Sequence, residues 1–341
     1  MNRTTHRITM KDVAQAVGVS VTTVSHALNG TRLVEESTKN KILRVVSELG
    51  YEPNILARSL KGKGTKTIGI ILSDISETFF SEIVKSIEKI ASDQGYNIML
   101  CDSEGSSQKE DLYINLLLQK GVDGLIISPV NQYKEFQWEN HSSKPYVQID
   151  RKTQSARGCF IGIDNEGSAQ RVTEILLDRG CRKVGFIGYG DEFYTMGERF
   201  KGYLKGINRF ALDPCVYRTE HRRESVDSLA DWLKQQRPDG LLCTNEVLSY
   251  TSFLAAEKLK IKIPEDLRMI GYDDARWLTL LKTPLTVVRQ PTEQIGRSAI
   301  NMIIQMIESK SSAQQKNVIH SCEIIVRDSC GSKDNKRVSI P

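Results

Sequence analysis

The sequence predicts an all-α helix-turn-helix head followed by an α/β body of two similar lobes, each built on a parallel sheet. Three observations lead to this prediction. Short helical patterns separated by glycines fill the first fifth of the chain, and from residue 66 onward short apolar runs alternate with helical patterns, as in βαβ units. The apolar runs of the body then return at a fixed spacing. A chain of 341 residues is also long enough for two or three compact units.

Charge is distributed unevenly along the chain. Residues 1–66 contain eleven Lys and Arg against five Asp and Glu, which gives +6, and the remaining residues carry −1 of the total charge of +5. A basic first segment indicates a polyanion as its partner. A solvated basic tail is the alternative on charge alone.

Composition argues against a membrane protein and against a secreted one. No apolar stretch approaches the ~20 residues that span a bilayer, and the polar start MNRTTHRITMKDVAQ has no apolar signal core. The seven cysteines form no CxxC pair, which favours reduced core residues over a disulfide framework. We therefore expect a cytoplasmic protein with no metal, no cofactor and no membrane partner.

Residues 9–50 predict helices and not a tail. The TMKD stretch at 9–12 has the pattern of a capping box and starts a first helix. Gly18 then supplies a turn, and Ser20 caps a second helix over 21–28. Two short helices joined by a tight glycine turn predict a helix-turn-helix, whose second helix lies in the major groove of DNA.

A third helix supports this pair. It starts near Ser37, stops at Gly50 and buries one face, formed by Ile42, Val45, Val46 and Leu49. On the second helix Thr22 and His26 are one turn apart, so both can face the same groove. A small helical bundle that binds nothing has the same periodicity and is the alternative.

The residues themselves resemble a known family. ITMKDVAQAVGVSVTTVSHALNGTRLVEES, followed by LGYEPNILARSL, resembles the head and hinge of the LacI/GalR family of bacterial repressors. DISETFF, VQIDR, GIDNEG, GERFKGY, IPEDLRMIGYDD and LTVVRQP resemble landmarks of that family's body, so the resemblance covers essentially the whole chain. It implies a sequence-specific DNA-binding transcription regulator, with repression as the family default, controlled by a small-molecule effector bound between two lobes.

The resemblance also implies roles in DNA binding. Thr22 and His26 would read base edges, and the phosphates would be contacted by Ser20, Thr23, Ser25 and Asn29. Many relatives have arginine in place of His26, although histidine also occurs in the purine-repressor branch. An operator inferred from the arginine-bearing relatives therefore does not transfer to this chain.

The segment 53–66 is predicted to be a hinge. PNILARSL gives a helix of about two turns, which is too short to be stable alone in water, and the basic KGKGTK follows it. By resemblance, hinge helices of two subunits pair in the minor groove, where Leu60 is an apolar wedge and Asn54 and Arg58 are further DNA contacts. Ordinary packing between head and body is the alternative role for Leu60.

The body repeats one pattern twice. TIGII at 67–71 matches KVGFI at 183–187, and DGLI at 123–126 matches DGLL at 239–242. Both matches have an offset of 116 residues. An equal offset at two strands indicates two similar lobes. The family body is similar to periplasmic sugar-binding proteins, in which the chain crosses between lobes three times. The expected units are a head at 1–52, a hinge at 53–66, a first lobe at 67–163 plus 292–321 and a second lobe at 164–291 plus 322–341.

Candidate effector-binding residues lie just past predicted strand ends, where loops line the cleft between the lobes. These strand-end residues are Asp74, Ser128, Asp150, Arg151, Asn245 and Asp273, and Arg199 lies at the start of a helix. By motif position, the effector would be hydrogen-bonded by Arg199, Asn245 and Asp273 and packed against Phe79 and Phe80. For each residue the alternative is a structural role, in which the side chain at the strand end hydrogen-bonds to backbone groups nearby.

The pattern favours a sugar, a sugar acid or a sugar phosphate over a purine as effector. Planar acceptor and donor groups suit paired hydroxyls and arginine suits acids and phosphates. Phe193 and Leu242 do not reproduce the arginine and the stacking aromatic expected in a purine pocket. Glu246 stands where many relatives have Asp, and the extra methylene would alter how that turn is held. A regulator whose co-effector is a phosphoprotein, as in carbon catabolite control, is an alternative within the family.

Other function classes are disfavoured. The GYG at 188–190 hints at a dinucleotide fingerprint, but its third glycine is replaced by Phe193, and no Ser-His-Asp elbow, HExxH or Walker lysine is present. We therefore expect no enzyme, and residues 1–60 argue against a transport binding protein. Two-fold operators demand two heads, which predicts a homodimer. The tail 331–337 has no apolar heptad, so a tetramer built by a C-terminal coiled coil is not expected.

Overall fold

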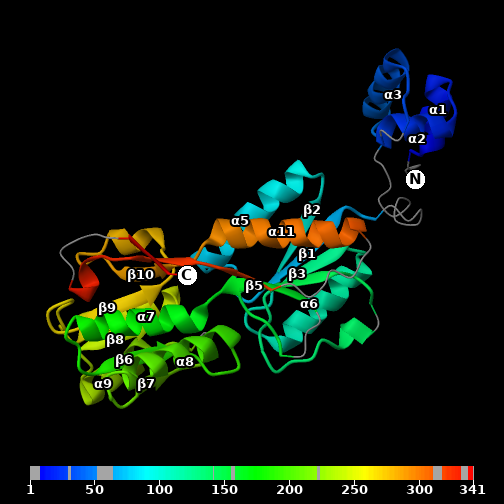
Figure 1. Ribbon diagram of the computed structural model, residues 1–341. Coiled ribbons are helices and arrows are strands. Elements are labelled where there is room, and N and C mark those ends of the chain that lie inside the picture. Colours follow the sequence, from blue (N-terminus) through cyan, green and yellow to red (C-terminus); the bar gives the residue numbers. More distant parts are fainter. Residues whose placement is uncertain are drawn as a thin grey trace, which may run out of the picture. The chain divides into compact units, whose positions relative to one another are not determined.

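The computed structural model describes most of the chain, and its residues fall into two compact units, 1–65 and 66–341 (Figure 1). The described ranges are 8–29, 32–51, 64–140, 142–154, 158–220, 223–309, 317–331 and 337–340. The predicted hinge helix lies outside these ranges. No helix within them is both long and apolar enough to cross a membrane.

The described residues of the first unit form three helices, as the sequence predicts. They are α1 (Met10–Val17), α2 (Val21–Asn29) and α3 (Glu36–Leu49). Both the backbone N–H and the hydroxyl of Thr9 donate to the Asp12 carboxylate at 2.7 Å, which fixes the start of α1. Gly18 ends α1 in the left-handed conformation, at φ 78°, and Ser20 caps α2 by accepting the Thr23 N–H at 3.0 Å. The helix-turn-helix therefore follows from three local signals.

The three helices enclose a small core of Val13, Ala14, Val17, Val24, Ala27, Ile42 and Tyr51. The prediction that Leu49 is buried is wrong, because its side chain is 37% exposed. Leu49 is the last residue of α3, and Gly50 turns the chain away at φ 62°. Tyr51 covers the core at this end instead, with its N–H bonded to the carbonyl of Val46 at 3.0 Å.

The first sheet of the body is parallel throughout, with strands in the order β11-β5-β4-β3-β1-β2. The strands are β1 (Thr67–Leu72), β2 (Asn97–Asp102), β3 (Gly124–Ile127), β4 (Tyr146–Ile149), β5 (Cys159–Ile163) and β11 (Val318–His320). Helices α5 (Thr78–Asp93) and α11 (Thr292–Ser309) pack together over one face. Helix α6 (Ser107–Gln119) and the short η1 (Gln137–Asn140) cover the other face with a second apolar cluster.

The second sheet has the order β13-β12-β10-β9-β8-β6-β7. Its strands are β6 (Val184–Gly188), β7 (Cys215–Arg218), β8 (Gly240–Cys243), β9 (Arg268–Tyr272), β10 (Thr286–Arg289), β12 (Cys322–Ile325) and β13 (Arg337–Ile340). Helices α7 (Asn165–Asp178) and α8 (Tyr194–Asn208) pack together on one face. Helices α9 (Val226–Gln236) and α10 (Glu246–Lys258) lie on the other, with η2 (Arg276–Thr279) and η3 (Asp328–Cys330) near the strand ends.

The two sheets share one strand order, which confirms the prediction of two similar lobes. Strands β2-β1-β3-β4-β5 correspond to β7-β6-β8-β9-β10, and the sequence repeat falls on β1 and β6 and on β3 and β8. The second sheet differs from a purely parallel one, because β12 and β13 are antiparallel to their neighbours. Only Ser321 separates β11 from β12, so one extended chain runs out of the first sheet directly into the second. Its direction in the second sheet is therefore fixed by its direction in the first.

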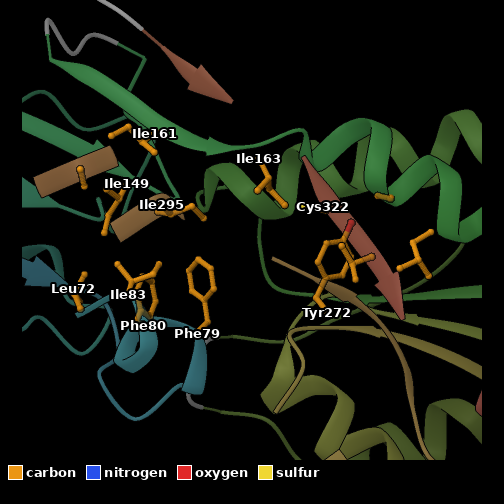
Figure 2. Packing of buried hydrophobic residues seen from close by; sticks show 14 of the residues in the cluster. Leu72, Phe79, Phe80, Ile83, Ile149, Ile161, Ile163, Tyr272, Ile295 and Cys322 are labelled. Atoms are coloured by element: carbon orange, nitrogen blue, oxygen red, sulfur yellow. The ribbon is translucent and has the colours of Figure 1, made fainter. Parts of the chain in front are cut away.

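The core continues across the crossovers between the lobes. One buried cluster includes Ile68, Phe80 and Ile83 of the first lobe and Tyr272 of the second. Figure 2 shows Ile163, at the end of β5, between Phe79 of the first lobe and Tyr272 of the second, and Cys322, at the start of β12, belongs to the same cluster. Apolar packing thus fixes the segments that carry the chain from one lobe to the other.

Helices α7 and α8 approach closely because glycine faces the contact. A Cβ on Gly202 would lie 2.1 Å from the carbonyl oxygen of Glu166 and 2.8 Å from the backbone nitrogen of Gln170. No real Cβ occupies such a position, so a side chain there must push the helices apart. This contact matters for the cleft because α8 also carries Arg199.

We expect Gly202→Ala to lower the free energy of unfolding of the body by about 3 kcal/mol, because the added methyl overpacks a backbone contact. Gly197→Ala on the same helix is the matched control. Its nearest neighbour would be the Gln132 amide nitrogen at 3.7 Å, so we expect unchanged or slightly raised stability. Thermal and urea unfolding of both variants measure the difference, and equal stability of the two would contradict this account of the α7–α8 contact.

Candidate functional site

Polar side chains gather where the strands of both sheets end. Asp74 follows β1, Ser128 follows β3 and Asp150 follows β4 in the first lobe. Asn245 follows β8 and Asp273 follows β9 in the second lobe. All five side chains are buried. Carboxyl ends of parallel strands are the usual location of ligand sites in open α/β sheets.

Asp150 and Asp273 occupy equivalent positions in the two lobes and share one backbone geometry. Their φ angles are 62° and 69°, in the left-handed region that L-residues rarely adopt. In each case the N–H bonds to the next strand, Asp150 to Ile161 at 3.0 Å and Asp273 to Val288 at 2.9 Å. Such a conformation costs about 1–3 kcal/mol and is often found at functional sites.

Burial dominates the electrostatics of these carboxyl groups. It raises the pKa of Asp150, against the opposing effect of the nearby Arg151 and Arg199 guanidinium groups. It raises the pKa of Asp273 to about 6, while Arg199 and the Gln290 amide act to lower it and Asp150 to raise it. Asp150 and Asp273 come from different lobes, and the carboxyl group of Asp150 acts on the pKa of Asp273 as a like charge nearby.

Glu77, the residue before α5, is another buried acid with a raised pKa. Its side chain is 7% exposed, and burial raises the pKa of Glu77 to about 8 although Arg151 acts to lower it. Three more carboxyl groups raise it further, those of Asp273, Asp74 and Asp150. Glu77 therefore belongs to the same cluster, although its sequence position gave no signal beyond a charged residue at a helix start.

Arg199 is fixed by the second lobe. Its Nε donates to Oδ1 of Asn165 at 2.8 Å and its Nη1 donates to the backbone carbonyl of Thr244. The guanidinium lies 3.8 Å from the ring centroid of Tyr272, whose hydroxyl is 2.8 Å from that of Ser168. Arg199 is thus a preorganised positive group beside Asp150 and Asp273.

Arg151 is held more loosely and faces between the lobes. Its Nε lies 3.4 Å from Oδ2 of Asp150, and its guanidinium stacks at 4.8 Å on the ring of Phe193 from the second lobe. The residue is only 5% exposed, yet Nε and Nη1 have no hydrogen-bond acceptor among the described residues. The hydroxyl of Ser128 also has none there. Buried donors are normally hydrogen-bonded, so these atoms are available to bind acceptors from outside the chain.

Contacts across the cleft join the lobes beside this cluster. The N–H and hydroxyl of Thr78, next to Glu77, donate to the Glu246 carboxylate at 3.2 and 3.3 Å. Glu246 also accepts from Nε1 of Trp277 at 2.8 Å. A second link is formed by Gln132, whose N–H donates to the carbonyl of Glu192 at 2.9 Å. The longer side chain of Glu246 thus spans the cleft.

The structure brings most of the predicted cleft residues together, since Asp74, Asp150, Arg151, Arg199 and Asp273 interact electrostatically. Asn245 lies at the same edge, where its Oδ1 caps α10 by accepting the Leu248 N–H at 2.9 Å. Phe79 and Phe80 pack edge to face with ring centroids 5.0 Å apart, and both are buried in the core cluster (Figure 2). Sequence reasoning missed Gln290, a buried residue between β10 and α11 that donates to Asp273 at 2.7 Å.

The head presents its candidate DNA-binding residues on α2 and just before it. Thr22 is exposed, while Ser25 and His26 are half-buried. The hydroxyls of Ser20 and Thr23 are 2.8 Å apart, so these two side chains also serve the helix start. The other predicted DNA contacts, the side chain of Asn29 and residues Asn54, Arg58 and Leu60, lie outside what the structure describes.

Comparison with known proteins decides the family. A family model for bacterial regulatory proteins, lacI family, matches residues 9–54, and one for a periplasmic binding protein-like domain matches residues 173–330. The HTH-type transcriptional repressor PurR of Vibrio vulnificus is 31% identical over 330 residues, which cover 94% of this chain and 98% of the relative. The chain belongs to the lacI family of bacterial regulatory proteins.

Solved structures show the same fold as this lacI-family protein. The lac repressor dimer bound to operator and the anti-inducer ONPF superposes with a TM-score of 0.83, at 21% identity, over 95% of this chain and 99% of the other. A periplasmic binding protein/LacI transcriptional regulator from Alkaliphilus metalliredigens, complexed with D-xylulofuranose, gives 0.69 at 25% identity, over 77% and 98%. The lacI-family chain is therefore a DNA-binding transcriptional repressor with an effector-binding domain, and its family is one of regulators and not of enzymes.

The raised pKa of Glu77 makes the stability of this lacI-family body depend on pH. A folded pKa of about 8 against an ordinary value of 4.5 means that the folded state holds the proton more tightly. The free energy of unfolding is then highest at acidic pH, where Glu77 is protonated in both states, and it falls as the pH rises from about 5 to about 8. We expect the fall in the free energy of unfolding between pH 5 and pH 8 to be smaller by about 2–4 kcal/mol in Glu77→Gln, since each pKa unit corresponds to about 1.4 kcal/mol.

Urea unfolding of the ligand-free protein at pH 5 and pH 8 measures the effect. Glu77→Gln should match the wild type at pH 5 and exceed it at pH 8. Glu88→Gln, on the exposed side of α5, is the control and should follow the wild type at both values. A Glu77→Gln protein that loses stability with pH as steeply as the wild type would show that Glu77 is ionised in the folded state.

Proposed function

We propose that this repressor responds to a sugar or sugar derivative bound between the two lobes, and that the response changes operator binding by its head. The observation that carries the proposal is the set of buried, unpartnered donors of Arg151 and Ser128 beside the carboxyl groups of both lobes. A polyhydroxylated ligand matches such a site, because each hydroxyl accepts one hydrogen bond while donating another. The contact between Arg151 and Phe193 of the second lobe supports a site between the lobes.

The family members compared above suggest two effector classes. PurR names a purine repressor, whereas the Alkaliphilus metalliredigens regulator is complexed with D-xylulofuranose, a sugar. The contacts of this chain support the sugar. Phe193 is engaged by the Arg151 guanidinium, and Leu242 is fully buried within β8, so neither offers a free face to a purine ring.

We further propose that two copies of the chain bind one operator. Strand β2 is the edge of the first sheet, and apolar side chains of β2 and α6 are exposed beside it: Met99, Leu100, Leu112 and Leu116. An exposed apolar edge strand is normally covered in a stable protein. A second copy of the chain covers it in a two-fold dimer, which also supplies the second head that a two-fold operator requires.

For DNA recognition we propose that Thr22 and His26 read base edges and that Ser20, Thr23, Ser25 and Asn29 contact phosphates. The spacing on α2 supports this assignment, since Thr22 and His26 lie one turn apart on the helix that a helix-turn-helix places in the major groove. The proposed hinge contacts of Asn54, Arg58 and Leu60 rest on the family resemblance alone.

We expect His26→Ala in the full chain to relax base preference at one position of each operator half-site by about tenfold, because one base contact is worth about 1–3 kcal/mol. Operators selected from genomic DNA by the full chain, and their single-base variants, are compared by fluorescence anisotropy. Glu48→Ala, exposed at the end of α3, is the control and should leave the preference unchanged. An equal loss of affinity for every sequence would exclude His26 as a base reader.

The effector proposal is tested with the same operators. A panel of sugars, sugar acids, sugar phosphates and purine bases is screened for a rise in melting temperature and for a change in operator affinity. We expect at least one sugar compound to do both, and Arg151→Gln to weaken its binding roughly 10- to 100-fold, since a hydrogen bond to a charged group contributes about 1.5–3 kcal/mol.

Arg171→Gln, exposed on α7, is the matched control for the arginine substitution and should keep the response. A response to purine bases alone, or a sugar response that survives Arg151→Gln unchanged, would overturn the proposed effector site.

A further inference from the structure

The effector cleft holds more buried acids than bases. Four carboxyl groups interact there, those of Asp74, Glu77, Asp150 and Asp273, against the two guanidinium groups of Arg151 and Arg199. All six side chains are buried. Buried charge without a counter-charge is unstable, so the cleft as it stands must take up protons or a cation.

Three of the four acids are already occupied by groups of the protein. Asp74 accepts from the N–H of Ser76 at 2.9 Å, Asp273 accepts from Gln290 at 2.7 Å, and Asp150 lies beside Arg151. Glu77 differs from them. Within the part of the chain that the structure describes, its carboxyl group makes neither a hydrogen bond nor an ion pair, although the side chain is more than nine-tenths buried.

Buried donors in the same cluster also lack partners. Nε and Nη1 of Arg151 and the hydroxyl of Ser128 have no hydrogen-bond acceptor among the described residues, and the charge of Arg151 acts to lower the pKa of Glu77. The groups of the cleft are therefore complementary to a ligand that has hydrogen-bond acceptors on one side and a positively charged donor on the other. Arg151 and Ser128 suit hydroxyl oxygens, and Glu77 suits an ammonium group.

We propose that the effector is a sugar-like polyol bearing a protonated amino group, and that Glu77 is the residue that selects for that group. The inference rests on the proposed function, since it names the chemical class that the same cleft takes. An amino sugar satisfies the unpartnered donors through its hydroxyls and supplies the missing positive charge. Sugar acids and sugar phosphates add negative charge to a site that already has an excess of it.

Binding of such a ligand is linked to a proton. With a pKa near 8, Glu77 is largely protonated at pH 7 in the free protein. The ammonium group replaces that proton, so the acid gives one proton to solvent as the ion pair forms. The charged groups that face Glu77 are Asp74, Asp150, Arg151, Asp273 and the phenol of Tyr189. Tyr189 keeps its proton at pH 7 because its pKa is raised far above that pH, and Asp273, with a pKa of about 6, is mostly ionised there.

The test compares matched ligands on the full chain by calorimetry and thermal shift. Glucose, galactose and mannose are each used as the parent hexose, the 2-amino sugar, the N-acetylated amino sugar and the 6-phosphate. Tris and its uncharged analogue pentaerythritol form a further pair that does not depend on sugar stereochemistry. We expect at least one amine to bind ten times or more tighter than both its hydroxyl and its acetylated partner.

Substitution then assigns the preference to Glu77. Glu77→Gln should reduce the advantage of the amine to less than threefold, and Glu88→Gln on the same helix should keep it. In the wild type at pH 7, titrations in phosphate and HEPES buffers, which differ in heat of ionisation, should show release of about one proton with the amine and none with its neutral partner. This last measurement needs no variant, so it holds even where Glu77→Gln folds poorly.

Each contrary result overturns the inference. Tighter binding of a phosphate or a neutral parent sugar, an amine preference that survives Glu77→Gln, absence of proton release, or binding of no ligand in the set would each do so. A neutral sugar that binds and changes operator affinity separates the two proposals, because the sugar-responsive function would then stand while the amine selectivity fails.

Discussion

The burial of ionisable groups between the two lobes is the constraint on which the rest of the body depends. Isolated charges cannot be removed from water without partners, so residues from several elements bind them. Asn165 and Thr244 bind Arg199 from two elements, and Tyr272 stacks on it. Gln290 comes from the segment that crosses back to the first lobe and binds Asp273. Side chains from different elements of the fold thus bind the buried charged groups of the cleft.

The same constraint links the charge of the cleft to the relative position of the lobes. Glu77 and Thr78 are adjacent at the start of α5, and Thr78 is bonded to Glu246 at the start of α10 in the other lobe. A change in the charge or hydrogen bonding of Glu77 therefore acts directly beside a contact that holds the lobes together. Binding energy at this point can favour one arrangement of the lobes over another, which is what an effector must do to alter a protein's conformation.

Much of the fold could be predicted because its signals are local. Capping residues and turn glycines define the head helices, and the equal offset of two strand pairs reveals the duplicated lobe. The positions of the cleft acids follow from a general rule about strand ends, although their roles stay predictions. What sequence reasoning missed depends on tertiary contacts: Leu49 is exposed because Tyr51 folds back over the core, and Gln290 reaches Asp273 only because a crossover brings it there.

The duplication allows equivalent residues of the two lobes to be compared. Asp150 and Asp273 are equivalent, share the left-handed backbone and are both buried. The residues that follow them have diverged. Asp274 is tied into the second lobe by Arg289 at 2.9 Å and Arg327 at 2.6 Å, so its charge is fully compensated within the protein. Arg151, at the same position in the first lobe, keeps two buried donors without acceptors. The same backbone position can be satisfied internally, as Asp274 is, and this difference between the lobes supports the proposed effector contact of Arg151.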